Sequence, residues 1–554
     1  MTTIHVLADR RHLWTFSIGC LAVTVGVLLH LPMYWMGRDN GFHLAQMPMD
    51  AEMWWGMALI LIGIAVAGYG LLPRQTVAGA AAHHVVVSAP EDAPLGRAHK
   101  QLMVVLTLAL VIDVMKPASL GFVVPGMKSE YGITAATVAW LPFAALCGTV
   151  VGSVLWGVLA DLYGRRASIL LSAVMFVGTS ICGAMPSFWW NVGMCFLMGA
   201  AAGGMLPVTY ALLAETMPTR QRGWVLVLVG GLGAVGGYLA ASGFAGWLEP
   251  TFSWRILWFL NLPTGLILIF MNRMIPESPK FLVAMGHLGE ANQMLRRFGC
   301  VARDEVNPSA VADDEAVAPV AALAATPRLA GTTWALSITA LAWGLINFGL
   351  LLWMPAHLVA KGYPMALSSQ LLAASALIAL PTVFVAAWLY SRWSSKGALM
   401  VAIALSAAGL AGVIQLELGG NVSPVWSIAL LIIGSNGVIA MLLPYAAESY
   451  PLAVRGRATG WVAACTKAGG LVAQLLGLLA LVPVLWVGAW AVLVPVLAAL
   501  GLVGWYCVET RGRDLRDFDG PRVPSPRSRP RCFRSETSCA FGGRAWPIPP
   551  PARC

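Results

Sequence analysis

Fourteen long apolar segments, separated by short charged loops, constrain the fold of this chain more than any other feature. A helix needs about 20 residues to cross the hydrocarbon core of a bilayer. Hydrophobic residues make up 58% of the chain and charged residues 11%, whereas soluble domains carry about 25% charged residues. We therefore predict an all-α integral membrane protein. The segments span residues 13–36, 53–73, 102–125, 136–160, 167–186, 188–213, 224–247, 254–273, 332–357, 369–390, 397–416, 424–447, 458–480 and 482–507.

A charged motif, Glu-x-x-Pro-x-x-x-Arg-Gly, occurs twice in the chain, 233 residues apart. One copy contains Glu215 and Arg222, and the other contains Glu448 and Arg455. Such a duplication indicates a transporter built from two homologous halves. At the ends of membrane helices, these charges can form ion pairs in one state and exchange partners in another. Static anchoring of the helix ends is the alternative.

The segments and loops divide the chain into six parts. The first segment is too long for a cleaved signal peptide, so we interpret it as a retained helix. Within the long loop between the halves, residues 290–297 are typical of an amphipathic helix, and residues 303–328 of disorder. The predicted parts are two extra transmembrane helices (1–75), a cytoplasmic linker (76–100), an N-terminal six-helix bundle (101–273), a cytoplasmic inter-bundle loop (274–331), a C-terminal six-helix bundle (332–507) and a disordered basic tail (508–554).

Basic residues favour one side of the predicted helix weave. Arg10, Arg165, Arg166, Arg392 and Arg457 all fall in loops on that side. Since Lys and Arg are enriched in cytoplasmic loops, we expect both termini in the cytoplasm and the protein in the cell (inner) membrane.

The loop after the fourth segment resembles the signature loop of the major facilitator superfamily. It contains Gly157, Asp161, Gly164, Arg165 and Arg166. The resemblance implies a twelve-helix core in two six-helix bundles over about residues 100–510. It also implies a conformational lock, in which Asp161 contacts the helix that starts near Ala458, while Gly157 allows close helix approach. A solvated loop that only sets topology is the alternative. The matching loop of the second half, residues 390–396, lacks the acid, so we expect a weaker lock there.

Residues 276–282 resemble the Pro-Glu-Ser-Pro-Arg segment of sugar porters, organic ion transporters, aromatic-acid symporters and the synaptic vesicle glycoprotein type. This resemblance implies the metabolite, sugar and organic-acid proton symporter-like branch, with alternating access by rocking of the two halves. Members of the drug-exporter branch usually carry their extra helix pair in the middle of the chain. Here the extra pair comes first, which disfavours that branch.

Three charged residues stand out deep inside predicted membrane helices. Asp113 and Lys467 lie about halfway along their segments, and Lys116 shares a helix face with Asp113. Ionised groups at this depth are costly and usually functional. We interpret Asp113 as the proton-coupling residue, and Lys116 and Lys467 as lining a polar cavity between the halves. A purely structural ion pair is the alternative.

Two asparagines, Asn347 and Asn436, are further candidates for the cavity, although they could equally hydrogen-bond neighbouring helices. The two lysines outnumber Asp113, which favours an anionic solute. We therefore predict a proton-coupled secondary transporter of a small organic solute, acting as a monomer. A proton-antiport exporter of drugs or metabolites is the first alternative, and a non-transporting receptor is the second. We expect no enzyme, metal, cofactor or nucleic-acid partner, because no catalytic or metal-ligating constellation is present.

Overall fold

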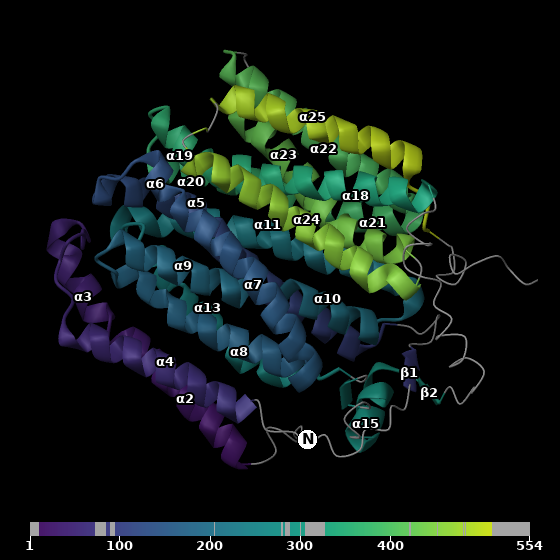
Figure 1. Cartoon of the computed structure of the whole chain (residues 1–554), viewed down its shortest axis with the longest axis horizontal. Helices are drawn as coiled ribbons and strands as arrows, with labels where there is room; N and C mark the ends of the chain where they lie inside the picture. The colour runs from purple at the N-terminus through teal and green to yellow at the C-terminus, as the bar shows by residue number, and fades with distance from the viewer. Residues whose placement is uncertain are drawn as a thin grey trace, which may run out of the picture.

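The computed structural model of the chain is almost entirely helical (Figure 1). It describes residues 10–71, 85–88, 95–203, 205–278, 281–282, 288–299, 301–304, 327–419, 423–450, 452–479, 481 and 484–511. Residues 305–326 of the predicted disordered stretch, and the predicted tail beyond 511, lie outside these ranges.

The helices before and within the first half follow the predicted segments. Before the core come α2 (Arg10–Leu28), α3 (Leu31–Met36), η1 (Gly37–Asn40) and α4 (Ala51–Leu71). The first half contains α5 (Arg97–Tyr131), α6 (Ala135–Val138), α7 (Trp140–Tyr163), α8 (Arg165–Gly178), η2 (Thr179–Ala184), α9 (Phe188–Ala202), α10 (Met205–Thr216), α11 (Thr219–Phe252), α12 (Ile256–Phe259), α13 (Asn261–Phe270) and η3 (Met271–Met274).

The second half is also helical, and two of its turns are π-helical. Its elements are α18 (Pro327–Gly344), the π turn η4 (Leu345–Leu351), α19 (Leu352–Ala360), α20 (Met365–Ala379), α21 (Thr382–Trp388), the π turn η5 (Leu389–Trp393), α22 (Ser395–Glu417), α23 (Pro424–Ser449), α24 (Leu452–Leu478) and α25 (Leu485–Tyr506). Among the described residues, 12 helices are long and apolar enough to cross a membrane, and two shorter apolar helices span 188–202 and 256–270. The predicted all-helical architecture is confirmed.

The loop between the halves contains the amphipathic helix expected there, α15 (Leu288–Phe298). It is followed by β2 (Val301–Asp304), which pairs antiparallel with β1 (Val85–Ser88) from the linker. The sequence analysis did not predict this small sheet. The Val-Val-Val run of β1 suits an extended strand, because β-branched side chains favour strands.

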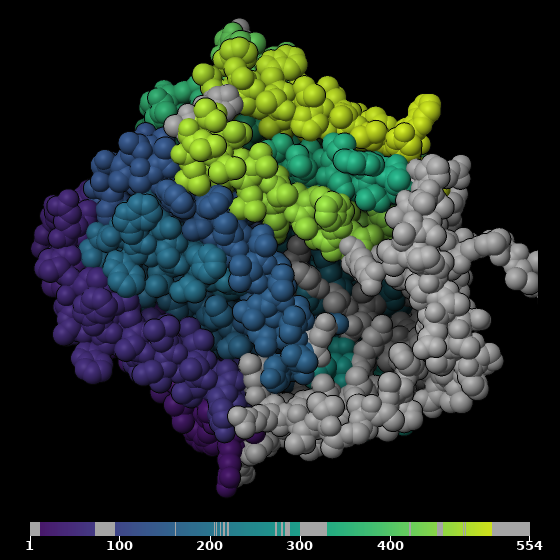
Figure 2. All heavy atoms as spheres, in the orientation of Figure 1, coloured from purple at the N-terminus to yellow at the C-terminus, as the bar shows by residue number. Residues whose placement is uncertain are grey.

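The two N-terminal helices form a hairpin in which glycines bring the backbones close together. α2 and α4 lie side by side along one edge of the molecule (Figures 1 and 2). A Cβ atom added to Gly63 of α4 would lie 2.7 Å from Cγ2 of Val23 on α2, and one added to Gly56 would lie 2.6 Å from the ring of His30. Glycine contacts of this kind allow the close helix packing seen in membranes.

Polar contacts at one end of the hairpin attach it to the first half. The Tyr34 hydroxyl donates to the carbonyl of Phe252 at 2.7 Å. The backbone N–H of Leu44 donates to Oε1 of Glu130 at 2.8 Å. Glu130 also forms a 2.6 Å ion pair with Arg255, and both side chains are buried. The hairpin is therefore fixed to the N-terminal half at this end.

Apolar side chains of α8 complete the attachment along the length of the hairpin. Leu170, Val174 and Val177 are buried against α2 and α4. On the other side of the bundle, the glycine-rich run of α11 packs tightly on α5: a Cβ atom at Gly233 would lie 2.5 Å from Leu110. The glycines of this run therefore allow close packing of α11 on α5.

The two halves meet through a few pairs of helices. α11 packs on α20 and α23, α5 packs on α19, and α7 packs on α24. At Gly121 of α5, the backbone of α19 comes so close that a Cβ atom would collide with the carbonyl oxygen of Leu352. Figure 2 shows the surface hollowed between the first half and α24.

The hairpin contact can be tested with two glycines on α4. Gly63→Ala places a methyl group against Val23, whereas Gly68→Ala meets only Leu171, at 3.9 Å. Overpacking costs about 1–3 kcal/mol, so Gly63→Ala should lower the unfolding temperature in detergent while Gly68→Ala leaves it near that of the unmodified protein. Equal melting curves for the two variants would contradict the tight packing at Gly63.

Candidate functional site

Asp113 lies in α5 at a point where the helix cannot complete its hydrogen bonding. Pro117, four residues later, has no N–H to donate to the Asp113 carbonyl. The Asp113 side chain is 7% exposed, and its Oδ1 atom has no hydrogen-bond partner within the described part of the chain. A carboxyl group in this position is poorly solvated and depends on nearby charges.

The described charges that act on Asp113 are Lys116 and Lys467. Lys116 belongs to the same helix, whereas Lys467 lies on α24 in the second half. Among the described ion pairs shorter than 4.0 Å, none joins these three residues. The structure thus brings Asp113 and Lys467 near the contact between the halves without a direct ion pair.

The two lysines differ in where their ammonium groups lie. Lys116 is 1% exposed, and its Nζ atom lies 2.8 Å from the centroid of the Phe176 ring on α8, inside the first half. Lys467 is only partly buried, and its Nζ atom lies 5.5 Å from the ring centroid of Phe348 in η4. Lys116 is therefore buried against a ring inside the first half, whereas Lys467 stays partly accessible; the cavity role predicted for both stays a prediction.

Of the two asparagines, Asn347 is the one adjacent in the chain to Phe348. It is partly buried and immediately precedes Phe348 in η4. Asn436 is 8% exposed in α23, and no described contact joins it to Asp113, Lys116 or Lys467. The cavity role predicted for both residues stays a prediction.

Gln474, which the sequence analysis missed, is fully buried next to this group. Its side-chain amide donates to the backbone carbonyl of Phe348, and its Oε1 atom accepts from Nε1 of Trp353 at 3.3 Å. Gln474 follows Lys467 by seven residues and therefore shares its helix face. A glutamine in an otherwise apolar stretch of α24 was the available sequence signal.

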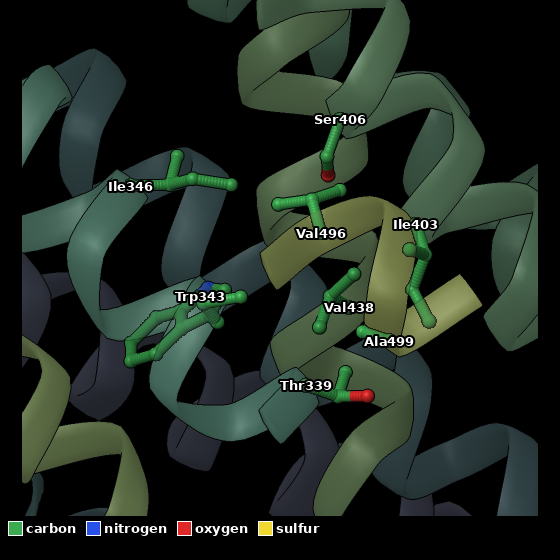
Figure 3. A pocket seen from close by; sticks show the side chains of 9 residues that line it. Thr339, Trp343, Ile346, Ile403, Ser406, Val438, Val496 and Ala499 are labelled. Atoms are coloured by element: carbon green, nitrogen blue, oxygen red, sulfur yellow. The ribbon is translucent and has the colours of Figure 1, made fainter. Parts of the chain in front are cut away.

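A small pocket lies inside the second half (Figure 3). Its walls are mostly apolar, with Trp343 and Ile346 on one side and Val438 and Val496 on another. The Ser406 hydroxyl beside it donates to its own helix at 3.0 Å. Its residues come only from the second half, so this pocket is not the polar cavity predicted between the halves.

The loop predicted to act as a conformational lock is held by an acid from elsewhere in the chain. Glu277 accepts hydrogen bonds from the backbone N–H groups of Arg165 at 2.7 Å and Arg166 at 3.3 Å, at the N-terminus of α8. Gly164 has φ +100°, and a Cβ atom there would lie 2.5 Å from Oε2 of Glu277. The carboxylate thus satisfies helix N–H groups that would otherwise be unpaired.

Two expectations for this loop have different outcomes. The Asp161 side chain lies outside the described residues, so its lock contact stays a prediction. Close helix approach at Gly157 is not seen: no described atom lies within 4 Å of a Cβ atom built there.

Burial raises the pKa of Glu277 to about 7, although hydrogen bonds from Ser278, Arg165 and Arg166 oppose this rise.

The second half has a carboxylate cap of its own, although residues 390–396 lack an acid; the weaker lock expected in that loop stays a prediction. Glu509, which follows α25, accepts from the backbone N–H of Ser395 at 2.8 Å and from its hydroxyl at 2.6 Å. It occupies the same place after the last helix of its half as Glu277 does in the first. The matching pairs Glu277-Ser278 and Glu509-Thr510 were the signal that could have revealed it.

The duplicated charged motifs contact one another across the two halves. Oε2 of Glu448 accepts from the Tyr390 hydroxyl at 2.8 Å and from the Thr510 hydroxyl at 2.7 Å. Arg222 of the first motif is among the charges that act on Glu448, and a Cβ atom at Gly223 would lie 3.3 Å from its Oε1. The side chains of Glu215 and Arg455 lie outside the described residues. The exchange of partners stays a prediction.

Comparisons with known proteins agree with this architecture. A family profile described as Major Facilitator Superfamily matches residues 106–473. The niacin transporter NiaP of Acinetobacter baylyi is 26% identical over 70% of this chain and 89% of its own length. The gentisate transporter of Corynebacterium glutamicum is 26% identical over 65% of this chain and 76% of its own.

A solved structure shows the same fold. The MFS proton:xylose symporter XylE, bound to 6-bromo-6-deoxy-D-glucose, superposes with a TM-score of 0.60 at 16% identity, over 76% of this chain and 98% of its own. This transporter comes from E. coli.

The family profile begins within α5, so α2, α3 and α4 lie outside it. Within the described residues, no cluster of three or more metal-binding side chains is present.

Glu277 should make the stability of the protein depend on pH. Because burial raises its pKa from 4.5 to about 7, the folded chain retains a proton there that the unfolded chain releases. This stabilisation is complete below about pH 4.5 and is lost as the pH rises through 7, a change on the order of 3 kcal/mol. Thermal unfolding in detergent across this range measures it. The Glu277→Gln variant cannot ionise, so it should lack this part of the slope; identical slopes would contradict the assignment.

Proposed function

Since the chain belongs to the Major Facilitator Superfamily, we propose that it is a secondary active transporter that moves a small organic anion together with protons by alternating access. The observation that carries this proposal is the buried carboxyl group of Asp113, with Lys116 on its own helix and Lys467 on the opposite half as the charges acting on it. An ionisable carboxyl group placed this deep is costly, so its presence in a membrane helix points to a functional role.

Proton and solute movement are coupled because Asp113 and the solute compete for the positive charge of Lys467. Asp113 and the carboxylate of a bound solute both gain from the same ammonium group, and they repel each other when both are ionised. A proton on Asp113 removes that repulsion, so proton and anion bind better together than either does alone. Because Lys467 belongs to the second half, movement of the halves changes the surroundings of Asp113 and allows the proton to leave on the other side.

The ring of Phe348 beside Lys467 suits a flat solute. An aromatic acid could place its carboxylate at the ammonium group and its ring against nearby aromatic side chains. Niacin and gentisate, named for two relatives, are both carboxylic acids on a ring. We therefore propose an aromatic carboxylate as the solute class, taken up into the cell when the outside is more acidic.

The conformational cycle would be controlled at the ends of the helices. We assign the lock to Gly157, Asp161, Gly164, Arg165 and Arg166 together with Glu277, which holds the start of α8. The second contact is the pair formed by Arg222 and Glu448, with Glu215 and Arg455 as their duplicated counterparts. Opening the solute path to the cytoplasm requires both contacts to separate.

The remaining features of the proposal concern the membrane. The distribution of Lys and Arg supports cytoplasmic termini and a place in the cell (inner) membrane. We propose that α2 and α4 cross the bilayer beside the twelve-helix core, and that a single chain contains the whole solute path.

Neutralising Asp113 should abolish uphill transport. In proteoliposomes with an acidic exterior, the unmodified protein should accumulate radiolabelled niacin or another aromatic acid, whereas Asp113→Asn should only equilibrate it. Asp39→Asn, which changes an exposed aspartate in η1, serves as the control. Undiminished proton-driven accumulation by Asp113→Asn would reject the assignment. If the unmodified protein accumulates no organic anion at all, the symport proposal fails.

Removing the ammonium group of Lys467 should weaken solute binding. A hydrogen bond to a charged group contributes about 1.5–3 kcal/mol, so Lys467→Met should raise the KM for the anion about tenfold or more. Lys128→Met, at an exposed position near the end of α5, should keep the original KM. The concentration dependence of initial uptake rates measures both, and an unchanged KM for Lys467→Met would remove Lys467 from the binding site.

A further inference from the structure

The π turn η4 is stabilised by a side chain from the neighbouring helix. In a π turn the backbone hydrogen bonds run to the fifth residue back, so the local pattern differs from that of the flanking α-helix. The carbonyl of Phe348 lies within this turn, and it accepts from the side-chain amide of Gln474 on α24. The other end of the same amide accepts from Trp353, just after the turn. Gln474 is 0% exposed, so these two contacts use both ends of a buried amide.

The ring of Phe348 is held on several sides. Trp343 packs edge-on, with 5.7 Å between ring centroids. A Cβ atom at Gly470 of α24 would lie 2.7 Å from Cδ2 of Phe348 and 3.1 Å from Cδ1 of Leu146, which belongs to the first half. The ring is partly buried and lies where the two halves meet.

The same ring faces the ammonium group of Lys467. The 5.5 Å from Nζ to the ring centroid is within the range of a cation–π interaction. Lys467, Gly470 and Gln474 are separated by three and four residues, so all three lie on one face of α24. Among the described ion pairs none includes Lys467, so the ring is the described contact that orients its charge.

We propose that Phe348 and Gln474 are positioning residues for Lys467: Gln474 holds the π turn, the turn places the ring of Phe348, and the ring directs the ammonium group towards the side where Asp113 and the solute lie. This inference rests on the proposed function, because it assigns a role in solute binding to residues beside the proposed site. Neither residue needs to touch the solute itself.

Volume-conserving substitutions test this arrangement in the full-length protein. Phe348→Met removes the ring, Gln474→Met removes the amide, and Phe348→Tyr keeps the ring. In proteoliposomes, with radiolabelled niacin as the probe, Phe348→Met and Gln474→Met should each raise the KM about tenfold with much less change in kcat. Phe348→Tyr should stay within about twofold of the original KM. The double Met variant should lose no more than the worse single variant, since both residues act through one contact.

The controls separate this inference from the proposed function. Phe384→Met, which replaces a 55% exposed side chain on α21, should transport normally. If the unmodified protein transports the probe but Phe348→Met keeps its original KM, the positioning role is wrong while the transport function stands. If Gln474→Met does not fold, the comparison of Phe348→Met with Phe348→Tyr decides the result alone. Equal increases of KM in these two variants would overturn the role of the ring.

Discussion

A carboxyl group buried where two helical halves meet is the constraint on which this structure depends. Asp113 is 7% exposed, and the charges that act on it come from Lys116 on its own helix and Lys467 on the other half. Ionised groups inside a membrane protein persist only with partners or a wet path. Because one partner belongs to the opposite half, separation of the halves changes the electrostatic energy of Asp113. In the transport cycle that we propose, this would link protonation of Asp113 to movement of the halves.

Each half also closes on itself through an acid that follows its last helix. Glu277 binds the first backbone N–H groups of α8, and Glu509 binds the start of α22. The first four N–H groups of a helix have no partner within that helix, so a carboxylate there satisfies them and interacts favourably with the helix dipole. The end of each half is therefore tied to its own third core helix, which favours movement of each half as one body.

Several features of this protein could be predicted from short stretches of sequence. A helix satisfies its own backbone hydrogen bonds, so about 20 apolar residues are enough to predict one membrane helix at a time. The fourteen helical segments, the helix-packing role of the glycines in α11 and the helix α15 follow from such local patterns. Asp113 and Lys467 could be selected in the same way, because charges stand out in apolar segments. The duplicated Glu and Arg motif predicts two halves for the same reason.

The sequence by itself determined the class of fold, the apolar segments that become helices and which charges lie within them. Only the tertiary structure decided what those charges face. Spacing places Lys116 beside Asp113, yet its ammonium group lies over Phe176 of α8. Glu277 caps a helix more than 100 residues earlier in the chain, and Gln474 binds the carbonyl of Phe348 on another helix. These contacts depend on which helices become neighbours, and that choice arises from packing of the whole chain rather than from any local pattern.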